Sequence, residues 1–286
     1  MEAWKREAGI EAMDIRMYGS LQYLAFPALD ALDTVRHAFS TRTGGVSEGF
    51  LSTMNFSFDR GDRPENVREN YRRVAEAIGV DPHSFCIARQ THTTNLRVVT
   101  EKDRGSGIDF ERPYRDIDGL VTNVRGITLV TFHADCIPLW FADPVHEAIG
   151  LAHAGWLGTV NGMGAAVVRT MREEYGTSPE DLTVCIGPGI CTDCYEIGGD
   201  VIKRFEAAFP GEERERVLKD FHVREDGPHW QLDLKEANRL LLIREGVPAE
   251  RIHLSDICTR CNHEQLFSHR HAGVRRGLNA AFLALK

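Results

Sequence analysis

The stretch TLVTFHADCIPLWFADPVHEAIGLAH, residues 128–153, decides the fold class. Apolar and β-branched residues at 128–133 and 148–153 predict two strands, and the pattern from residue 84 to residue 153 is nearly all strand. Helices are interleaved with strands elsewhere, but without strict β-α-β alternation. We therefore expect a mixed α/β (α+β) fold, a layered sandwich with central β-sheets and outer helices, rather than a doubly wound parallel sheet.

Further elements follow from the same periodicities. Short β-type runs predict strands at residues 84–89, 96–100, 119–122, 182–186, 230–233 and 251–254. Apolar faces with helical spacing predict helices from about residue 62 to Gly79, and at 164–175, 200–209, 234–245 and 278–285. Neither a P-loop nor a G-x-G-x-x-G after a strand is present, so the sequence contains neither nucleotide-binding motif.

Composition excludes several classes of protein. The 286 residues carry 34 Lys plus Arg against 42 Asp plus Glu, a formal charge of −8, and 42% are hydrophobic. The apolar share is enough for a full core, and the acidic balance argues against nucleic-acid binding. No apolar stretch approaches the about 20 residues of a membrane span. We expect a monomer or homodimer that acts on small molecules, with neither nucleic acid nor membrane as a partner.

The chain contains no linker rich in Pro, Gly or Ser. We therefore expect a single domain over 1–286, with a catalytic part at about 39–286 and an N-terminal extension at 1–20. The polar residues 210–229 are expected to form a surface excursion. Charged residues near the N-terminus are unlike a secretory signal, so we expect a cytoplasmic protein whose seven cysteines are free thiols.

Three potential metal ligands lie at or just past the ends of predicted strands: His92, Cys136 and His153. They are separated by 44 and 17 residues, which suits neighbouring strands that converge on one pocket better than a local metal-binding turn. Two imidazoles and a thiolate form a zinc ligand set with an open fourth position, where bound water can ionise near neutral pH. A metal-free Cys–His nucleophilic dyad fits the same residues.

Two neighbours of these residues are candidate members of the same site. Gln90 is two residues from His92, so in a strand both point to the same face. Asp135 is adjacent to Cys136 and points the opposite way in a regular strand. It reaches the pocket only if the backbone is irregular there, and is otherwise a structural acceptor.

Two arginines are candidates for binding phosphate or another part of the substrate. Arg42 lies beside Gly44 and Gly45, where free backbone N–H groups and a planar cation suit a phosphate or carboxylate. Arg270 lies between two histidines in FSHRH. The alternative for both is a surface arginine in an ordinary turn.

Two C-x-x-C pairs remain, Cys191/Cys194 and Cys258/Cys261. Together they offer a Cys₄ zinc site, but Cys258 follows Cys194 by 64 positions, far more than the about 15–20 residues between the pairs of a common zinc ribbon. We expect reduced structural thiols, with a second zinc or a disulfide as the alternatives.

Ten motifs, taken in order, resemble the laccase-domain family of the YfiH/YlmD type: FSTRTGG, RQTH, DGLVT, ADC, HAGW, IGPGI, CYEIG, DL..AN, DICT and FSHR. Members were long described as polyphenol oxidoreductases and are now described as purine nucleoside phosphorylases. The resemblance runs from about Phe39 to the C-terminus. It implies a four-layer sandwich like that of cytotoxic-necrotizing-factor-like domains.

The resemblance also implies a function. It makes His92, Cys136 and His153 the ligands of a catalytic metal, which we expect to be zinc, with copper as the other metal. We expect these three residues and Asp135 to be the catalytic residues. It implies a cytoplasmic enzyme that uses phosphate to split adenosine, inosine and methylthioadenosine into base and ribose 1-phosphate, and that deaminates adenosine. The family's tryptophan motif often continues with a basic residue. Here it reads WLG, which leaves more of the phosphate binding to Arg42 or Arg270.

Three other functions remain as alternatives. A cysteine hydrolase would use Cys136 as nucleophile and His153 as base. A copper phenol oxidase corresponds to the older family description, and a His₂Cys set can hold copper. A trinuclear copper cluster, however, needs several H-x-H pairs, and the chain has one, at His269 and His271. A non-catalytic binding domain would leave the three ligand-type residues without a role.

Overall fold

The computed structural model describes residues 3–286, and two six-stranded sheets form its centre. In spatial order the first sheet contains β1 (Asp14–Tyr18), β2 (Leu21–Ala25), β3 (Val35–Ser40), β15 (Asn279–Leu285), β7 (Thr128–His133) and β4 (Phe85–Ile87). The second contains β14 (Ile252–Leu254), β10 (Thr183–Ile186), β8 (Ile137–Asp143), β9 (Ala148–Ala154), β6 (Gly119–Thr122) and β5 (Leu96–Val98).

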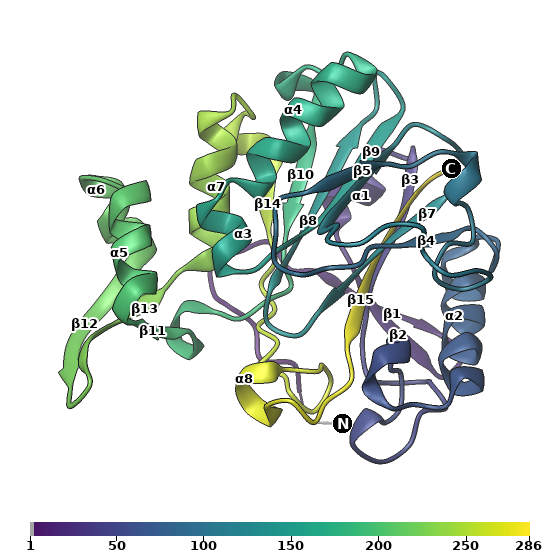
Figure 1. The fold of residues 1–286 in the computed structure, drawn as a ribbon, viewed down its shortest axis with the longest axis horizontal. Coiled ribbons are helices and arrows are strands. Elements are labelled where there is room, and N and C mark those ends of the chain that lie inside the picture. The colour runs from purple at the N-terminus through teal and green to yellow at the C-terminus, as the bar shows by residue number, and fades with distance from the viewer. Residues whose placement is uncertain (1–2) are drawn as a thin grey trace.

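Three apolar cores hold these layers together. The middle core lies between the two sheets and contains Phe39 of β3 and Trp140 of β8, both fully buried. On the outer face of the first sheet, α2 (Pro64–Ile78) contributes a second core. On the outer face of the second sheet, α4 (Met163–Tyr175) and α7 (Leu234–Arg244) contribute the third. The order helix, sheet, sheet, helix confirms the predicted sandwich (Figure 1).

A smaller unit projects from the edge of this sandwich (Figure 1). It contains β11 (Glu196–Gly198), α5 (Gly199–Ala208), α6 (Glu212–Val217), β12 (Leu218–Arg224) and β13 (Gly227–Leu232), and its strands pair in the order β11-β13-β12. Residues 210–229, expected to form a surface excursion, form a helix and most of a β-hairpin within this unit. The remaining α-helices within residues 3–286 are short: α1 (Pro27–Asp30), α3 (Trp156–Val160) and α8 (His269–Ala272).

The sequence did not predict seven of the strands within residues 3–286: β1, β2, β3, β8, β11, β12 and β15. The helix predicted at residues 278–285 is wrong, because this segment is β15, which pairs with β3 on one side and β7 on the other. All seven β15 residues are buried, and an apolar run this short fits a buried strand as well as a helix. Strand β8 was not predicted, since Pro138 interrupts its sequence. Pairing with β10 begins only at Leu139, so the N–H that Pro138 lacks falls outside that ladder.

The polypeptide crosses between the two sheets at two places close to the candidate residues. Residues 134–136 connect β7 of the first sheet directly to β8 of the second, and Asp135 there has φ +89°. Residues 88–95 connect β4 to β5, and His92 has φ +66°. Both crossings are irregular, and they bring ligand-type side chains to one region of the sandwich.

Candidate functional site

The structure brings His92, Cys136 and His153 into one cluster. Their ligand atoms all lie within 4.8 Å of one another, and the imidazole centroids of His92 and His153 are 4.9 Å apart. Gly155 makes this approach possible: a Cβ at that position would lie 3.1 Å from Cys136 Sγ and 3.1 Å from His92 Cδ2. The HAGW motif therefore needs a glycine there for space.

Asp118, immediately before β6, contacts the backbone of His92 and the imidazole of His153. Its buried carboxylate accepts hydrogen bonds from the backbone N–H groups of Thr91, His92 and Thr93 at 2.9–3.0 Å. It also lies 2.9 Å from His153 Nδ1. With Nδ1 engaged, His153 offers Nε2 to the cluster, which is the arrangement of metal-binding histidines supported by a carboxylate. Asp118 occurs in the quoted DGLVT motif, but sequence reasoning gave it no role.

The charges of the cluster are strongly coupled. Burial by itself would raise the pKa of the Cys136 thiol, but His153 and His92 outweigh it and lower that pKa to about 6. Burial would likewise lower the pKa of His153, whereas Cys136 and Asp118 raise it to about 9. Without a bound cation, the pair is therefore a thiolate beside an imidazolium at neutral pH. Burial holds the pKa of the neighbouring His133 well below its usual range, so this third imidazole stays neutral.

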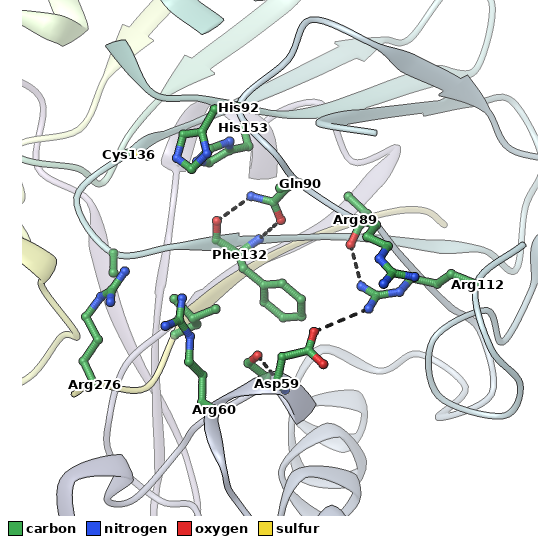
Figure 2. Close-up of a pocket in the computed structure, with 14 residues that line it drawn as sticks. Asp59, Arg60, Arg89, Gln90, His92, Arg112, Phe132, Cys136, His153 and Arg276 are labelled. Atoms are coloured by element: carbon green, nitrogen blue, oxygen red, sulfur yellow. Dashed lines mark hydrogen bonds and ion pairs between the residues drawn. The ribbon is translucent and has the colours of Figure 1, made fainter. Parts of the chain in front are cut away.

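A polar cavity of about 300 Å³ opens on one side of the cluster (Figure 2). It is lined by His92, Cys136 and His153 together with four arginines: Arg60, Arg89, Arg112 and Arg276. Arg112 is tied to the Ala88 carbonyl oxygen at 2.9 Å and lies 3.7 Å from the Asp59 carboxylate. Within residues 3–286, the guanidinium groups of Arg60 and Arg89 have no hydrogen bond or ion pair. The cavity therefore presents net positive charge.

An apolar cavity of about 280 Å³ opens on the other side. Trp156, Ile190, Tyr195 and Leu234 line it, and His92, Ala134 and Cys136 belong to both cavities. The cluster thus lies between an arginine-lined space and a space walled by aromatic and aliphatic side chains.

Gln90 and Asp135 lie beside the cluster, but their polar atoms are used by the fold. The Gln90 amide donates to the Phe132 carbonyl oxygen and accepts from the Phe132 N–H, both at 2.7 Å (Figure 2). Asp135 has a positive φ of +89°, the irregular backbone that would let its side chain reach the pocket. Its carboxylate accepts from the Thr259 hydroxyl and from the backbone N–H of Arg270, both at 2.6 Å. Gln90 lines the polar cavity and Asp135 the apolar one.

The structure does not bring Arg42 to the cluster. Its guanidinium donates to the carbonyl oxygens of Ser52 and His263 at 3.0 Å and lies over the Phe267 ring, and it lines neither cavity. Arg270 does line the apolar cavity, where it covers the Tyr195 ring and donates to the Glu196 carbonyl oxygen.

Sequence reasoning missed the four arginines of the polar cavity. They come from four separate segments, so no motif groups them. Arg276 donates from Nη1 to the Gly273 carbonyl oxygen at 3.0 Å, and its buried Nε has no partner within residues 3–286. Figure 2 shows Arg60 and Arg276 on the same side of the cavity.

Two groups of side chains within residues 3–286 could hold a metal ion: the cluster described above, and Cys191, Cys194, Cys258 and Cys261. His269 and His271 belong to neither group. The His₂Cys donor set and the fixed tautomer of His153 fit a resident metal.

Comparison with known proteins identifies the family. A family model described as multi-copper polyphenol oxidoreductase laccase matches residues 36–286. The chain belongs to this laccase-domain family. The purine nucleoside phosphorylase YlmD of Bacillus subtilis (strain 168) is 34% identical over 250 residues, 87% of each chain. The family resemblance drawn from the ten motifs is confirmed.

Two further comparisons extend this result. A protein named adenosine deaminase RL5, from an unknown prokaryotic organism, is 35% identical over 243 residues, covering 84% of this chain and 90% of that protein. The crystal structure of YlmD from Geobacillus stearothermophilus matches with a TM-score of 0.85 and 32% identity, covering 95% of this chain and 98% of that one. The fold of this family member is therefore the YlmD fold. No helix within residues 3–286 combines the length and apolarity needed to cross a bilayer.

The role of Asp118 can be tested by substitution. We expect Asp118→Asn to weaken metal binding by about 10–100-fold, because an amide NH₂ cannot accept the hydrogen bonds that fix His92 and His153. Metal affinity is measured by competition with a chromogenic chelator. Asp116→Asn is the matched control: Asp116 lies in the same loop and is exposed, and its carboxylate accepts a hydrogen bond from the Thr91 hydroxyl but none from His92 or His153. Equal loss in both variants would contradict the role given to Asp118.

The charge state of Cys136 gives a pH-dependent prediction. In protein stripped of metal, the rate of iodoacetamide labelling at Cys136 should rise with pH, with the midpoint of the rise at about pH 6, because the thiolate forms above its lowered pKa. His153→Ala should move the midpoint upward. Zinc added back should protect Cys136, and the fully buried Cys185 serves as the unlabelled control in mass spectrometry. Rapid labelling of Cys136 in fully metallated, active protein would exclude it as a ligand.

Proposed function

We propose that this chain is a zinc-dependent purine nucleoside phosphorylase that also deaminates adenosine. It would convert adenosine, inosine and methylthioadenosine to the free base and ribose 1-phosphate. The observation that carries the proposal is the position of His92, Cys136 and His153 between a cationic and an apolar cavity. The names of the related proteins, purine nucleoside phosphorylase and adenosine deaminase, support the same reaction classes.

Each part of the substrates has a matching surface. A phosphate dianion suits the arginine-lined cavity, since a guanidinium pairs with two phosphate oxygens at once. Arg42 lines neither cavity, and its Nε and Nη1 both donate to backbone carbonyl oxygens. The role is therefore assigned to Arg60 and Arg276, which line the polar cavity. A planar purine suits the apolar cavity, where Trp156 and Tyr195 offer aromatic surface. The ribose would then lie between them, beside the cluster.

The cluster's own residues would hold zinc, with His92, Cys136 and His153 as ligands and a fourth position open. Zinc at such a site supplies a Lewis acid and a water of lowered pKa. Copper would fit the same donors. Asp118 keeps His153 in the tautomer that presents Nε2 and holds the backbone around His92 in place.

Phosphorolysis forms a bond from a phosphate oxygen to C1′ as the bond from C1′ to the purine nitrogen breaks, and the base leaves with a proton. The arginines would hold the phosphate against C1′, which removes much of the entropic cost of bringing two molecules together. Deamination replaces the C6 amino group of adenosine with oxygen from water and releases ammonia. The two reactions act on different atoms of the same nucleoside, C1′ of the ribose and C6 of the purine, so one nucleoside-binding site could serve both.

One observation favours a second candidate, a metal-free cysteine hydrolase. Cys136 with its pKa near 6 and His153 with its pKa near 9 form the thiolate–imidazolium pair that such enzymes use. Cys136 would attack an acyl carbon and His153 would protonate the leaving group. This candidate requires activity in the complete absence of metal.

Product analysis with adenosine tests the proposed function. With phosphate we expect adenine and ribose 1-phosphate in equal amounts, and without phosphate we expect inosine and ammonia. Chelation should abolish both reactions and zinc should restore them. Free ribose formed independently of phosphate, or full activity after complete metal removal, would contradict the proposal.

The phosphate site has its own test. We expect Arg276→Ala to raise the KM for phosphate by about 10–100-fold, as for loss of a charge-assisted hydrogen bond of about 1.5–3 kcal/mol. Deamination uses water and should change much less. Arg275→Ala is the matched control, since Arg275 is exposed and lies over the Phe50 ring outside the cavity. Equal losses of both reactions in Arg276→Ala would show that it does not act through phosphate.

A further inference from the structure

Four cysteines form a second cluster, separate from the catalytic candidates. The Sγ atoms of Cys191, Cys194, Cys258 and Cys261 all lie within 4.8 Å of one another, and all four residues are free thiols. Cys261 Sγ is 3.9 Å from Cys191 Sγ and 3.5 Å from Cys194 Sγ. A tetrahedral zinc with Zn–S bonds of about 2.3 Å separates its sulfurs by about 3.8 Å. The observed spacing therefore fits a single four-coordinate ion.

The fold explains how two C-x-x-C pairs that are 64 positions apart in the sequence meet in space. Strands β10 and β14 are parallel neighbours in the second sheet. Cys191 follows the last residue of β10 by five positions, and Cys258 follows the last residue of β14 by four. A bridge between Gly189 and Cys258 continues the parallel pairing beyond the strands. Because the two chain segments leave the sheet side by side, each delivers its C-x-x-C pair to the same place.

The surroundings of the sulfurs suit thiolates. The backbone N–H groups of Cys191 and Cys261 both point to Cys258 Sγ, at 3.2 and 3.4 Å. The guanidinium of Arg260 lies 3.3 Å from Cys194 Sγ. These donors would offset the negative charge of four thiolates around a divalent ion and orient the ligands. Ile190 and Tyr195 pack against the cluster and cover it with apolar surface.

We propose that Cys191, Cys194, Cys258 and Cys261 bind a structural zinc ion. All four positions are filled by protein sulfur, which is the pattern of structural rather than catalytic zinc. The ion joins the segment after β10 to the segment after β14. The first continues into Tyr195 and the second into Arg270, and these two side chains stack on one wall of the apolar cavity. The second also holds Asp135 through Thr259. The zinc thus fixes the wall of the cavity without touching its contents.

Metal counting on the full chain tests the proposal. Wild-type protein purified under reducing conditions should contain two zinc ions, and the double variant His92→Ala/His153→Ala should retain one. Cobalt substituted into that variant should give the intense thiolate-to-cobalt absorption of a tetrahedral four-sulfur site. The double variant Cys194→Ser/Cys261→Ser should lose one zinc and unfold at lower temperature. Cys86→Ser, a buried cysteine outside both clusters, is the matched control and should retain both zinc ions.

Several results would overturn the proposal. One is a His92→Ala/His153→Ala variant that contains no metal and gives no thiolate–cobalt absorption. Another is a Cys194–Cys261 disulfide found by mass spectrometry in the native protein. These measurements do not need the cysteine variant to fold. They also separate the two sites: a failed catalytic assignment would leave the metal count unchanged in His92→Ala/His153→Ala, whereas a failed Cys₄ assignment would leave that variant without metal.

Discussion

The carboxylate of Asp118 is the group on which the geometry of the candidate site depends. It lies at the start of a strand in the second sheet and binds three consecutive backbone N–H groups of the loop that arrives from the first sheet. The same carboxylate holds the His153 ring on the neighbouring strand. Burial would raise the pKa of Asp118, but His153 and the backbone N–H groups lower it to about 2, so it stays ionised throughout the neutral range. One buried charge therefore holds the backbone of His92 and the imidazole of His153, which come from different parts of the chain, close to each other.

The sandwich architecture supplies the rest of the site. Where strand β7 passes into β8, the polypeptide leaves one sheet and enters the other within three residues, and Cys136 is the last of them. The positive φ of Asp135 allows this sharp turn. The Asp135 carboxylate accepts hydrogen bonds from the Thr259 hydroxyl and from the backbone N–H of Arg270. The cluster therefore lies where two layers meet. The two cavities beside it differ in character because different segments line them: Arg60 and Arg276 line the cationic cavity, whereas Trp156 and Leu234 line the apolar one.

Much of the fold could be predicted from periodicity. Strands β6 and β7 have the predicted bounds, β9 differs by one residue, and helices α2, α4, α5 and α7 occur where apolar spacing indicated them. Strands β1, β2, β3, β11 and β12 were not predicted at all. Two further errors have a common cause. Strand β15 and the unpredicted β8 are buried on both faces, so their sequences lack the alternation that marks a half-buried strand. Their conformation is determined by the strands on either side, which supply the hydrogen bonds.

The sequence by itself determined the chemistry available to this protein: two imidazoles and a thiolate at strand ends, two C-x-x-C pairs, and an order of motifs specific enough to indicate the family. It also indicated layered sheets, since residue spacing along a strand or helix is a local property. Only the tertiary structure decided which distant residues meet. Arg42, next to a promising glycine turn, is bound to backbone carbonyls, while Arg60 and Arg276 reach the cavity. The two cysteine pairs come together because parallel strands carry them. Such contacts depend on strand order and on crossings between sheets, and residue spacing along the chain does not encode either.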